Sequence, residues 1–241
     1  MEAPALSLAR LGRTKVRHRC SFRSAVASRK QRDLRGQDAP VQLDMYLTAV
    51  HEAGHAVICY AVGLGCGEIA LTAHILSKGA YGGTDGESGS GMKAGNRTGD
   101  AFHRGEFNQL LLGNAVLAMA GMAAERKAMI GLGVPPHVAA GASGDRALWN
   151  DVAKIYVRQD RRRTKFAFAA RVWRIVQDAV DDPRIWQAVL HIARRLFEGL
   201  SATTFRKRKA KIRHALPGRA AVATMLRHGV RAGMLQPDLT G

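Results

Sequence analysis

The chain has 241 residues, of which 46% are hydrophobic and 6% aromatic, and its formal net charge is +18 at pH 7. This apolar content is enough for a sizeable core and excludes a chain that is disordered throughout. Few aromatic residues and few β-branched runs, set against many Ala, Leu, Arg and Met, favour a mainly α fold over an all-β barrel.

The positive charge is concentrated towards the two ends of the chain. Residues 1–38 hold 10 Lys and Arg against 3 acids, and residues 158–231 hold 19 against 5, whereas residues 39–157 hold 8 against 10. We therefore divide the chain into a basic, disordered N-terminal extension (1–40), a core (41–160) and a basic helical C-terminal part (161–241). Blocks of like charge suit an anionic partner such as nucleic acid, although a solvated tail is the commoner explanation.

Three features bear on the compartment. Cys20, Cys59 and Cys66 are an odd number without a CxxC pair, which fits a reducing compartment better than a disulfide framework or a thiolate zinc site. The longest apolar stretch, residues 110–124, is too short to form a transmembrane segment. The Arg- and Ser-rich first 40 residues are typical of an organellar transit peptide and also of a basic arm. We interpret them as an arm and expect a cytoplasmic protein, with organellar targeting as the alternative.

Apolar periodicity and Gly, Pro and capping residues predict the elements that follow. In chain order these are a helix from Asp44 to about Gly63, a strand over 68–76, an exposed loop or hairpin over 78–96, a buried helix over 106–130, amphipathic helices over 143–158, 165–181 and 184–200, and a basic, helical final 40 residues.

The sequence HEAGH at residues 51–55 is an HExxH motif inside the first predicted helix. Residues four apart share a helix face, so the imidazoles of His51 and His55 can bind one zinc ion. Glu52 is rotated by about 100° from His51 and can stand beside a water at the remaining position. Zinc lowers the pKa of such a water towards about 7, and the carboxylate can then accept its proton as it attacks a carbonyl. The alternative explanation of the motif is a pair of surface histidines that bind no metal.

A catalytic zinc ion usually has three protein ligands, so a third must come from elsewhere in the chain. Glu125 lies on the buried helix, where it can be a ligand or a carboxylate that holds a ligand imidazole. His137 has only a flexible loop position in its favour. Asp145 lies at a predicted helix N-terminus, where the helix dipole keeps a carboxylate ionised. The residues alone leave Glu125 and Asp145 as nearly equal candidates.

Four sequence blocks in this order resemble the peptidase domain of FtsH-type ATP-dependent zinc metalloproteases. They are HEAGHAV at 51–57, SKGAYGGT at 77–84, AGMAAERKAMIG at 120–131 and GASGD at 141–145. The resemblance covers about residues 45–160 and implies a mainly α, zincin-like peptidase core with a small β edge element.

The resemblance also implies roles for individual residues. It implies that His51, His55 and Asp145 are the zinc ligands, that Glu52 is the general base, and that Glu125 has a structural or ligand-holding part. It further implies that residues 70–77 offer an unpaired strand edge to the substrate. The residues implied for this edge and the glycine-rich segment after it are Ile75, Leu76, Gly79, Gly82 and Gly83.

The chain also departs from the family pattern. These 241 residues contain no GxxxxGK[ST] loop and leave no room for an ATPase module, so we expect that the chain does not itself unfold a substrate with ATP. Gly144 stands where the family has Asn before the ligand Asp, and Arg126 follows Glu125 where the family has a second acid. Both changes fall next to predicted site residues.

These features predict a zinc-dependent metallopeptidase that hydrolyses peptide bonds in unfolded or partner-delivered polypeptide. It would hold one zinc ion per chain and have no ATPase of its own, so its partners would include a separate ATPase or further copies of itself. The alternative is a catalytically inactive, zinc-stabilised regulatory or binding module that contacts nucleic acid through its basic ends.

Overall fold

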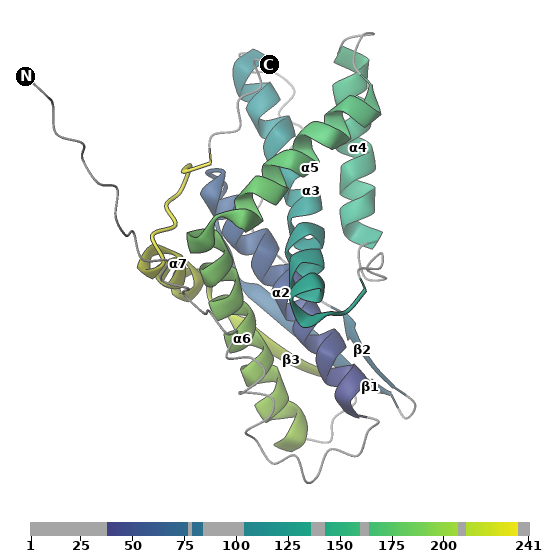
Figure 1. Cartoon of the computed structure of the whole chain (residues 1–241), viewed down its shortest axis with the longest axis vertical. Coiled ribbons are helices and arrows are strands. Elements are labelled where there is room, and N and C mark those ends of the chain that lie inside the picture. Colours follow the sequence, from purple (N-terminus) through teal and green to yellow (C-terminus); the bar gives the residue numbers. More distant parts are fainter. Residues whose placement is uncertain are drawn as a thin grey trace, which may run out of the picture. The chain divides into compact units, whose positions relative to one another are not determined.

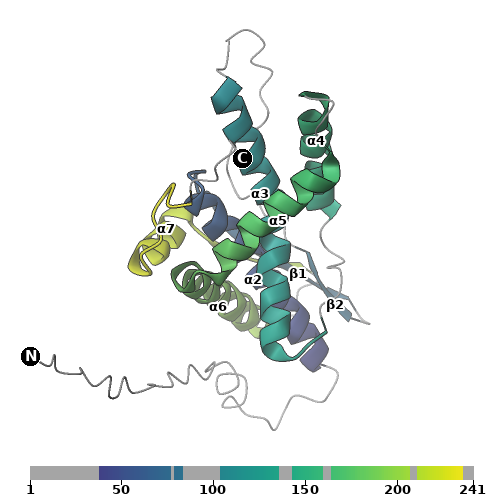
Figure 2. The same ribbon diagram turned by 45° about the horizontal axis from the view of Figure 1, so that its top comes forward.

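The computed structural model describes residues 38–76, 79–83, 104–135, 143–159, 164–206 and 211–235. These ranges contain six helices and three strands (Figures 1 and 2), so the mainly α class is confirmed. In chain order the elements are α2 (Asp38–Ala61), β1 (Ile69–Leu76), β2 (Gly79–Gly83), α3 (Arg104–Leu132), α4 (Ser143–Gln159), α5 (Lys165–Asp181), α6 (Pro183–Arg206), β3 (Lys211–Leu216) and α7 (Gly218–Arg227). No helix within the described ranges is long and apolar enough to cross a membrane.

Helices α2 and α3 meet through small residues. Val50, Ala53 and Val57 of α2 are fully buried, as the helical spacing of apolar residues predicts. A β-carbon added at Gly54 would lie 2.5 Å from the Cβ atom of Ala124 on α3, so only glycine fits at this crossing. This close approach brings the HExxH helix next to the helix that carries the third sequence block.

Helices α4 and α5 pack against α3, and α5 crosses α3 in both ribbon views (Figures 1 and 2). Phe168 of α5 stacks on two aromatic rings of α4, with ring centroids 5.4 Å from Trp149 and 4.0 Å from Tyr156. Thr164 caps α5 by accepting a hydrogen bond from a backbone N–H in its first turn, which explains why the helix begins at the predicted residue 165. These contacts hold α4 in place beside α3.

The three strands form an antiparallel sheet in the order β2-β1-β3. The central strand β1 pairs from Ile69 to His74 with β3 and from Thr72 to Leu76 with β2. The predicted strand over 68–76 is therefore confirmed, and β2 forms the hairpin expected after it. The prediction that residues 70–77 offer an unpaired strand edge is wrong for Ala70–His74, because β3 pairs with β1 along these residues.

The sequence predicts that the final 40 residues are helical. This prediction is wrong for Lys211–Leu216, which forms strand β3 and completes the sheet. Basic residues conceal the apolar alternation of this strand, whose last residue, Leu216, is buried. Arg213 also forms an ion pair with Glu68, just before β1. Pro40–Gly241 forms one compact unit.

Two predicted helix ends also differ from the structure. Helix α2 begins at Asp38, so Asp44 lies inside the helix and is not its N-cap. Helix α6 continues to Arg206, beyond the predicted end at residue 200. Both differences place more of the chain in helix than the apolar periodicity alone predicts.

Candidate metal centre

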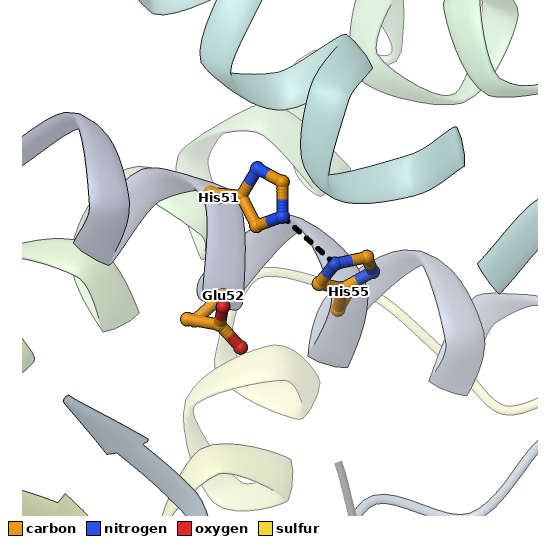
Figure 3. A group of neighbouring side chains, drawn as sticks. All are labelled: His51, Glu52 and His55. Atoms are coloured by element: carbon orange, nitrogen blue, oxygen red, sulfur yellow. Dashed lines mark hydrogen bonds between the residues drawn. The ribbon is translucent and has the colours of Figure 1, made fainter. Parts of the chain in front are cut away.

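The two histidines of the HExxH motif lie together on the buried side of α2. His51 is 8% exposed and His55 is 6% exposed, so the motif is not a pair of surface histidines. Their Nε2 atoms lie 3.0 Å apart, and the rings meet edge to face (Figure 3). This is the arrangement that a four-residue spacing on a helix predicts.

The carboxylate of Asp145 completes a triangle of three polar atoms. Its Oδ2 atom lies 3.0 Å from Nε2 of His51 and 3.3 Å from Nε2 of His55. Asp145 belongs to the first turn of α4, so the triangle joins residues 94 positions apart. The structure therefore brings together the three residues implied as zinc ligands by the resemblance.

Ligand atoms around one tetrahedral zinc ion, each about 2.0 to 2.2 Å from the metal, lie about 3.3 to 3.6 Å apart. The distances in the triangle are close to this spacing. Its two imidazoles and one carboxylate are also a donor set that zinc uses in catalytic sites. The three residues can therefore hold a metal ion on grounds of both distance and chemistry.

Glu125 of α3 contacts the other nitrogen of the His51 ring. Its Oε2 atom lies 3.1 Å from Nδ1 of His51, on the side of the ring that is not part of the triangle. A proton on Nδ1 donates to this carboxylate and leaves the lone pair of Nε2 facing Asp145 and His55. A lone pair and a carboxylate at 3.0 Å repel, so a proton or a metal ion must lie between Nε2 of His51 and Asp145.

The charges of the cluster shift the pKa values of its members in the metal-free protein. Burial lowers the pKa of His51, but the hydrogen bonds to Asp145 and Glu125 and the charge of Glu52 outweigh burial and raise it from 6.5 to about 10. Burial raises the pKa of Asp145, but hydrogen bonds and charges from the two histidines outweigh it and hold that pKa well below its usual value. Without a metal ion, a proton on His51 supplies the positive charge.

Glu52 lies near the histidines, and its side chain leaves α2 in another direction (Figure 3). One of its carboxylate oxygens lies within 4.8 Å of a ring nitrogen of each histidine, and the residue is 5% exposed. Glu52 could therefore complete a metal-binding group with the two histidines, but Asp145 approaches both histidines more closely, to 3.3 Å or less, and is the better candidate for a third ligand. Glu52 lies beside this centre and outside the triangle.

Gly121 of α3 is a site residue that the sequence analysis did not single out. A β-carbon at this position would lie 2.5 Å from Nε2 of His51 and 2.5 Å from Nε2 of His55. Glycine therefore keeps free the space where the two nitrogens converge. The signal available in the sequence was its place four residues before Glu125, on the same face of the buried helix.

The remaining predicted site residues are placed as follows. Ile75 and Leu76 pair with Ala80 and Gly79 across the β1–β2 hairpin, and Gly82 and Gly83 lie further along β2. Within the described residues β2 is an outer strand of the sheet. His137, the third alternative ligand, lies outside the described residues.

No model of a known protein family matches the chain, and comparison with curated proteins also gives no match.

Proposed function

We propose that this chain is a zinc-dependent metallopeptidase of the FtsH type, which hydrolyses peptide bonds in unfolded or partner-delivered polypeptide. The observation that carries the proposal is the triangle of His51 Nε2, His55 Nε2 and Asp145 Oδ2, with sides of 3.0, 3.0 and 3.3 Å. Two helices far apart in the sequence converge on it, and both imidazoles are buried.

In this proposal His51, His55 and Asp145 hold one zinc ion. Three protein ligands leave a fourth position for water or substrate, which distinguishes catalytic from structural zinc sites. A zinc ion bound there supplies Lewis acidity, which polarises a carbonyl and acidifies water. Glu125 fixes the tautomer and orientation of the His51 ring through its contact with Nδ1.

Glu52 is the proposed general base. Its carboxylate lies near both ligand imidazoles without belonging to the triangle, which is the position that a base for the attacking water requires. Glu52 accepts a proton from that water and returns it to the amine that leaves, which is the usual task of a carboxylate in such a position.

The substrate would add as a strand to the sheet, because main-chain hydrogen bonds accept many sequences. The edge of β1 is occupied by β3 over Ile69–His74, so the proposed substrate edge is the outer side of β2, from Gly79 to Gly83. Strand addition requires an extended chain. Unfolded polypeptide, or polypeptide delivered by a separate ATPase, meets this requirement in the cytoplasm or an organelle.

The decisive experiment measures zinc content and cleavage on the same purified proteins. The wild type should bind one zinc ion per chain and cleave a casein-type unfolded substrate. Asp145→Asn should lose most of the zinc, whereas Asp151→Asn should keep it, because Asp151 is an exposed carboxylate on the same helix. Full zinc retention by Asp145→Asn would exclude Asp145 as a ligand.

A second variant distinguishes the peptidase proposal from the alternative, a zinc-stabilised binding module. Glu52→Gln should keep the zinc and lose cleavage by about 10²- to 10⁴-fold, because it removes the base and leaves the ligands in place. Undiminished cleavage by Glu52→Gln would reject the mechanism. Zinc binding without any cleavage by the wild type would favour the binding module.

A further inference from the structure

A cluster of cationic side chains lies between α6 and α7, which contribute no residue to the candidate metal centre. At its base is Thr224 of α7, which is fully buried. The Thr224 hydroxyl donates a hydrogen bond of 3.0 Å to the carbonyl of Ala220. It accepts hydrogen bonds from the guanidinium groups of Arg227, at 3.1 Å, and Arg195, at 3.4 Å. One buried hydroxyl thus holds two guanidinium groups from different helices side by side.

Two histidines extend this cluster. Nε2 of His228 lies 3.3 Å from Nδ1 of His191, and the two rings meet edge to face. Burial, followed by the positive charges of His228, Arg227, Arg195 and Arg194, lowers the pKa of His191. The five groups therefore share one electrostatic neighbourhood, and each of them is a cation when it is charged.

Within the part of the chain that the structure describes, no carboxylate forms an ion pair with the two central arginines. Among the described residues, Arg195 and Arg227 form no ion pair, and their hydrogen bonds go to neutral oxygen atoms. Glu198 follows one turn later on α6 and forms no ion pair with them. Arg184 and Arg213, by contrast, are each paired with a carboxylate. Neighbouring like charges repel, and a bound anion would remove this repulsion.

We propose that the α6–α7 cluster, formed by His191, Arg194, Arg195, Arg227 and His228, is a binding site for a phosphate oxyanion. Arginine presents its N–H groups in a planar fork that matches phosphate oxygens, and imidazole N–H groups add further donors. The phosphate can belong to a small phosphorylated molecule or to the backbone of a nucleic acid. The excess of 19 Lys and Arg over 5 acids in residues 158–231 would draw either source to this region.

The first arm of the test uses inorganic pyrophosphate, titrated calorimetrically into the full chain. Arg195→Gln/Arg227→Gln should weaken binding at least tenfold. The matched control, Arg158→Gln/Arg174→Gln, removes the same charge from exposed positions on α4 and α5 and should leave binding within about twofold. Arg227→Gln alone changes an exposed residue and tests the site should the double variant not fold.

The second arm uses a mixed-sequence single-stranded oligonucleotide at several salt concentrations. If backbone phosphates occupy the cluster, the double variant should lower the slope of log affinity against log salt by about 1.4, which is about 0.7 for each lost phosphate contact. Selective loss in the pyrophosphate arm alone would assign the site to small phosphorylated molecules. If neither probe distinguishes the cluster variants from the control pair, or if the wild type binds neither probe, the proposal is wrong.

Discussion

Gly121 of α3 faces His51 of α2 so closely that a β-carbon at position 121 would lie 2.5 Å from Nε2 of the histidine. The same β-carbon would lie 2.5 Å from Nε2 of His55. A single glycine on a neighbouring helix therefore keeps open the space on which both proposed ligands converge. The candidate metal centre depends on the fit of α2 against α3 as well as on the HExxH motif.

We expect Gly121→Ala to reduce zinc binding at least tenfold, because the methyl group would occupy the space beside both ligand nitrogens. The measurement is zinc stoichiometry after dialysis against a weak chelator. The matched control is Gly131→Ala on the same helix, where a β-carbon would meet nothing within 4 Å. This control should bind zinc normally and gain about 0.5 to 1 kcal/mol of stability, as Gly to Ala changes do in exposed helix positions. Equal zinc content in the two variants would contradict the steric argument.

Glu125→Leu should weaken zinc binding by about 10- to 100-fold, which is the usual cost of losing a carboxylate that orients a ligand imidazole. Glu125→Gln should lose less, because its amide oxygen can still accept the hydrogen bond from Nδ1 of His51. Competition with a chromogenic zinc chelator gives the affinities. Arg126→Ala, at the exposed adjacent position, is the control and should match the wild type. Complete loss of zinc in Glu125→Gln would instead indicate that Glu125 is itself a ligand.

Gly54→Ala should destabilise the fold by about 1 to 3 kcal/mol, because its β-carbon would lie 2.5 Å from Cβ of Ala124 and force the helices apart. The free energy of unfolding can be measured by urea titration of the zinc-free proteins. Ala124→Gly removes the opposing methyl group, so the double variant should recover part of the loss. A double variant that is as unstable as the sum of the single variants would show that the two positions do not interact.

The stability of the zinc-free protein should depend on pH with a sign that follows from the two shifted pKa values. The pKa of His51 is raised from 6.5 to about 10. Its protonated form therefore contributes fully to stability below pH 6.5, and this contribution is lost as the pH rises towards 10. The pKa of Asp145 is lowered from 3.8, so its contribution is present above pH 3.8 and is lost on acidification below that value.

The contributions of His51 and Asp145 to the free energy of unfolding are therefore both fully present between pH 3.8 and 6.5, where the zinc-free protein should be most resistant to urea. Zinc must displace the His51 proton, so the stabilisation by added zinc should grow from about pH 5.5 to about pH 9. Urea titrations at about pH 5.5 and about pH 9, each with chelator and with added zinc, measure the stability of the zinc-free protein and the stabilisation by zinc. A zinc effect that is constant across this range would mean that no proton leaves the site when the metal binds.

The sequence by itself determined the local features of this protein. Helical periodicity located α3 and α5 within about two residues of their observed ends, because each helix carries its own apolar pattern and, for α5, its own cap. The HExxH spacing likewise determined that His51 and His55 share one face of a helix, since this follows from 3.6 residues per turn.

Only the tertiary structure decided the contacts between distant segments. The local sequence pattern left Glu125 and Asp145 as nearly equal candidates for the third ligand. The packing of α3 and α4 placed Glu125 against Nδ1 of His51 and Asp145 against Nε2. Strand β3 escaped prediction because its charged residues conceal the alternation and its pairing with β1 joins residues far apart in the sequence. The role of Gly121 was equally hidden, because the need for glycine arises from the helix opposite and not from its own neighbours in the sequence.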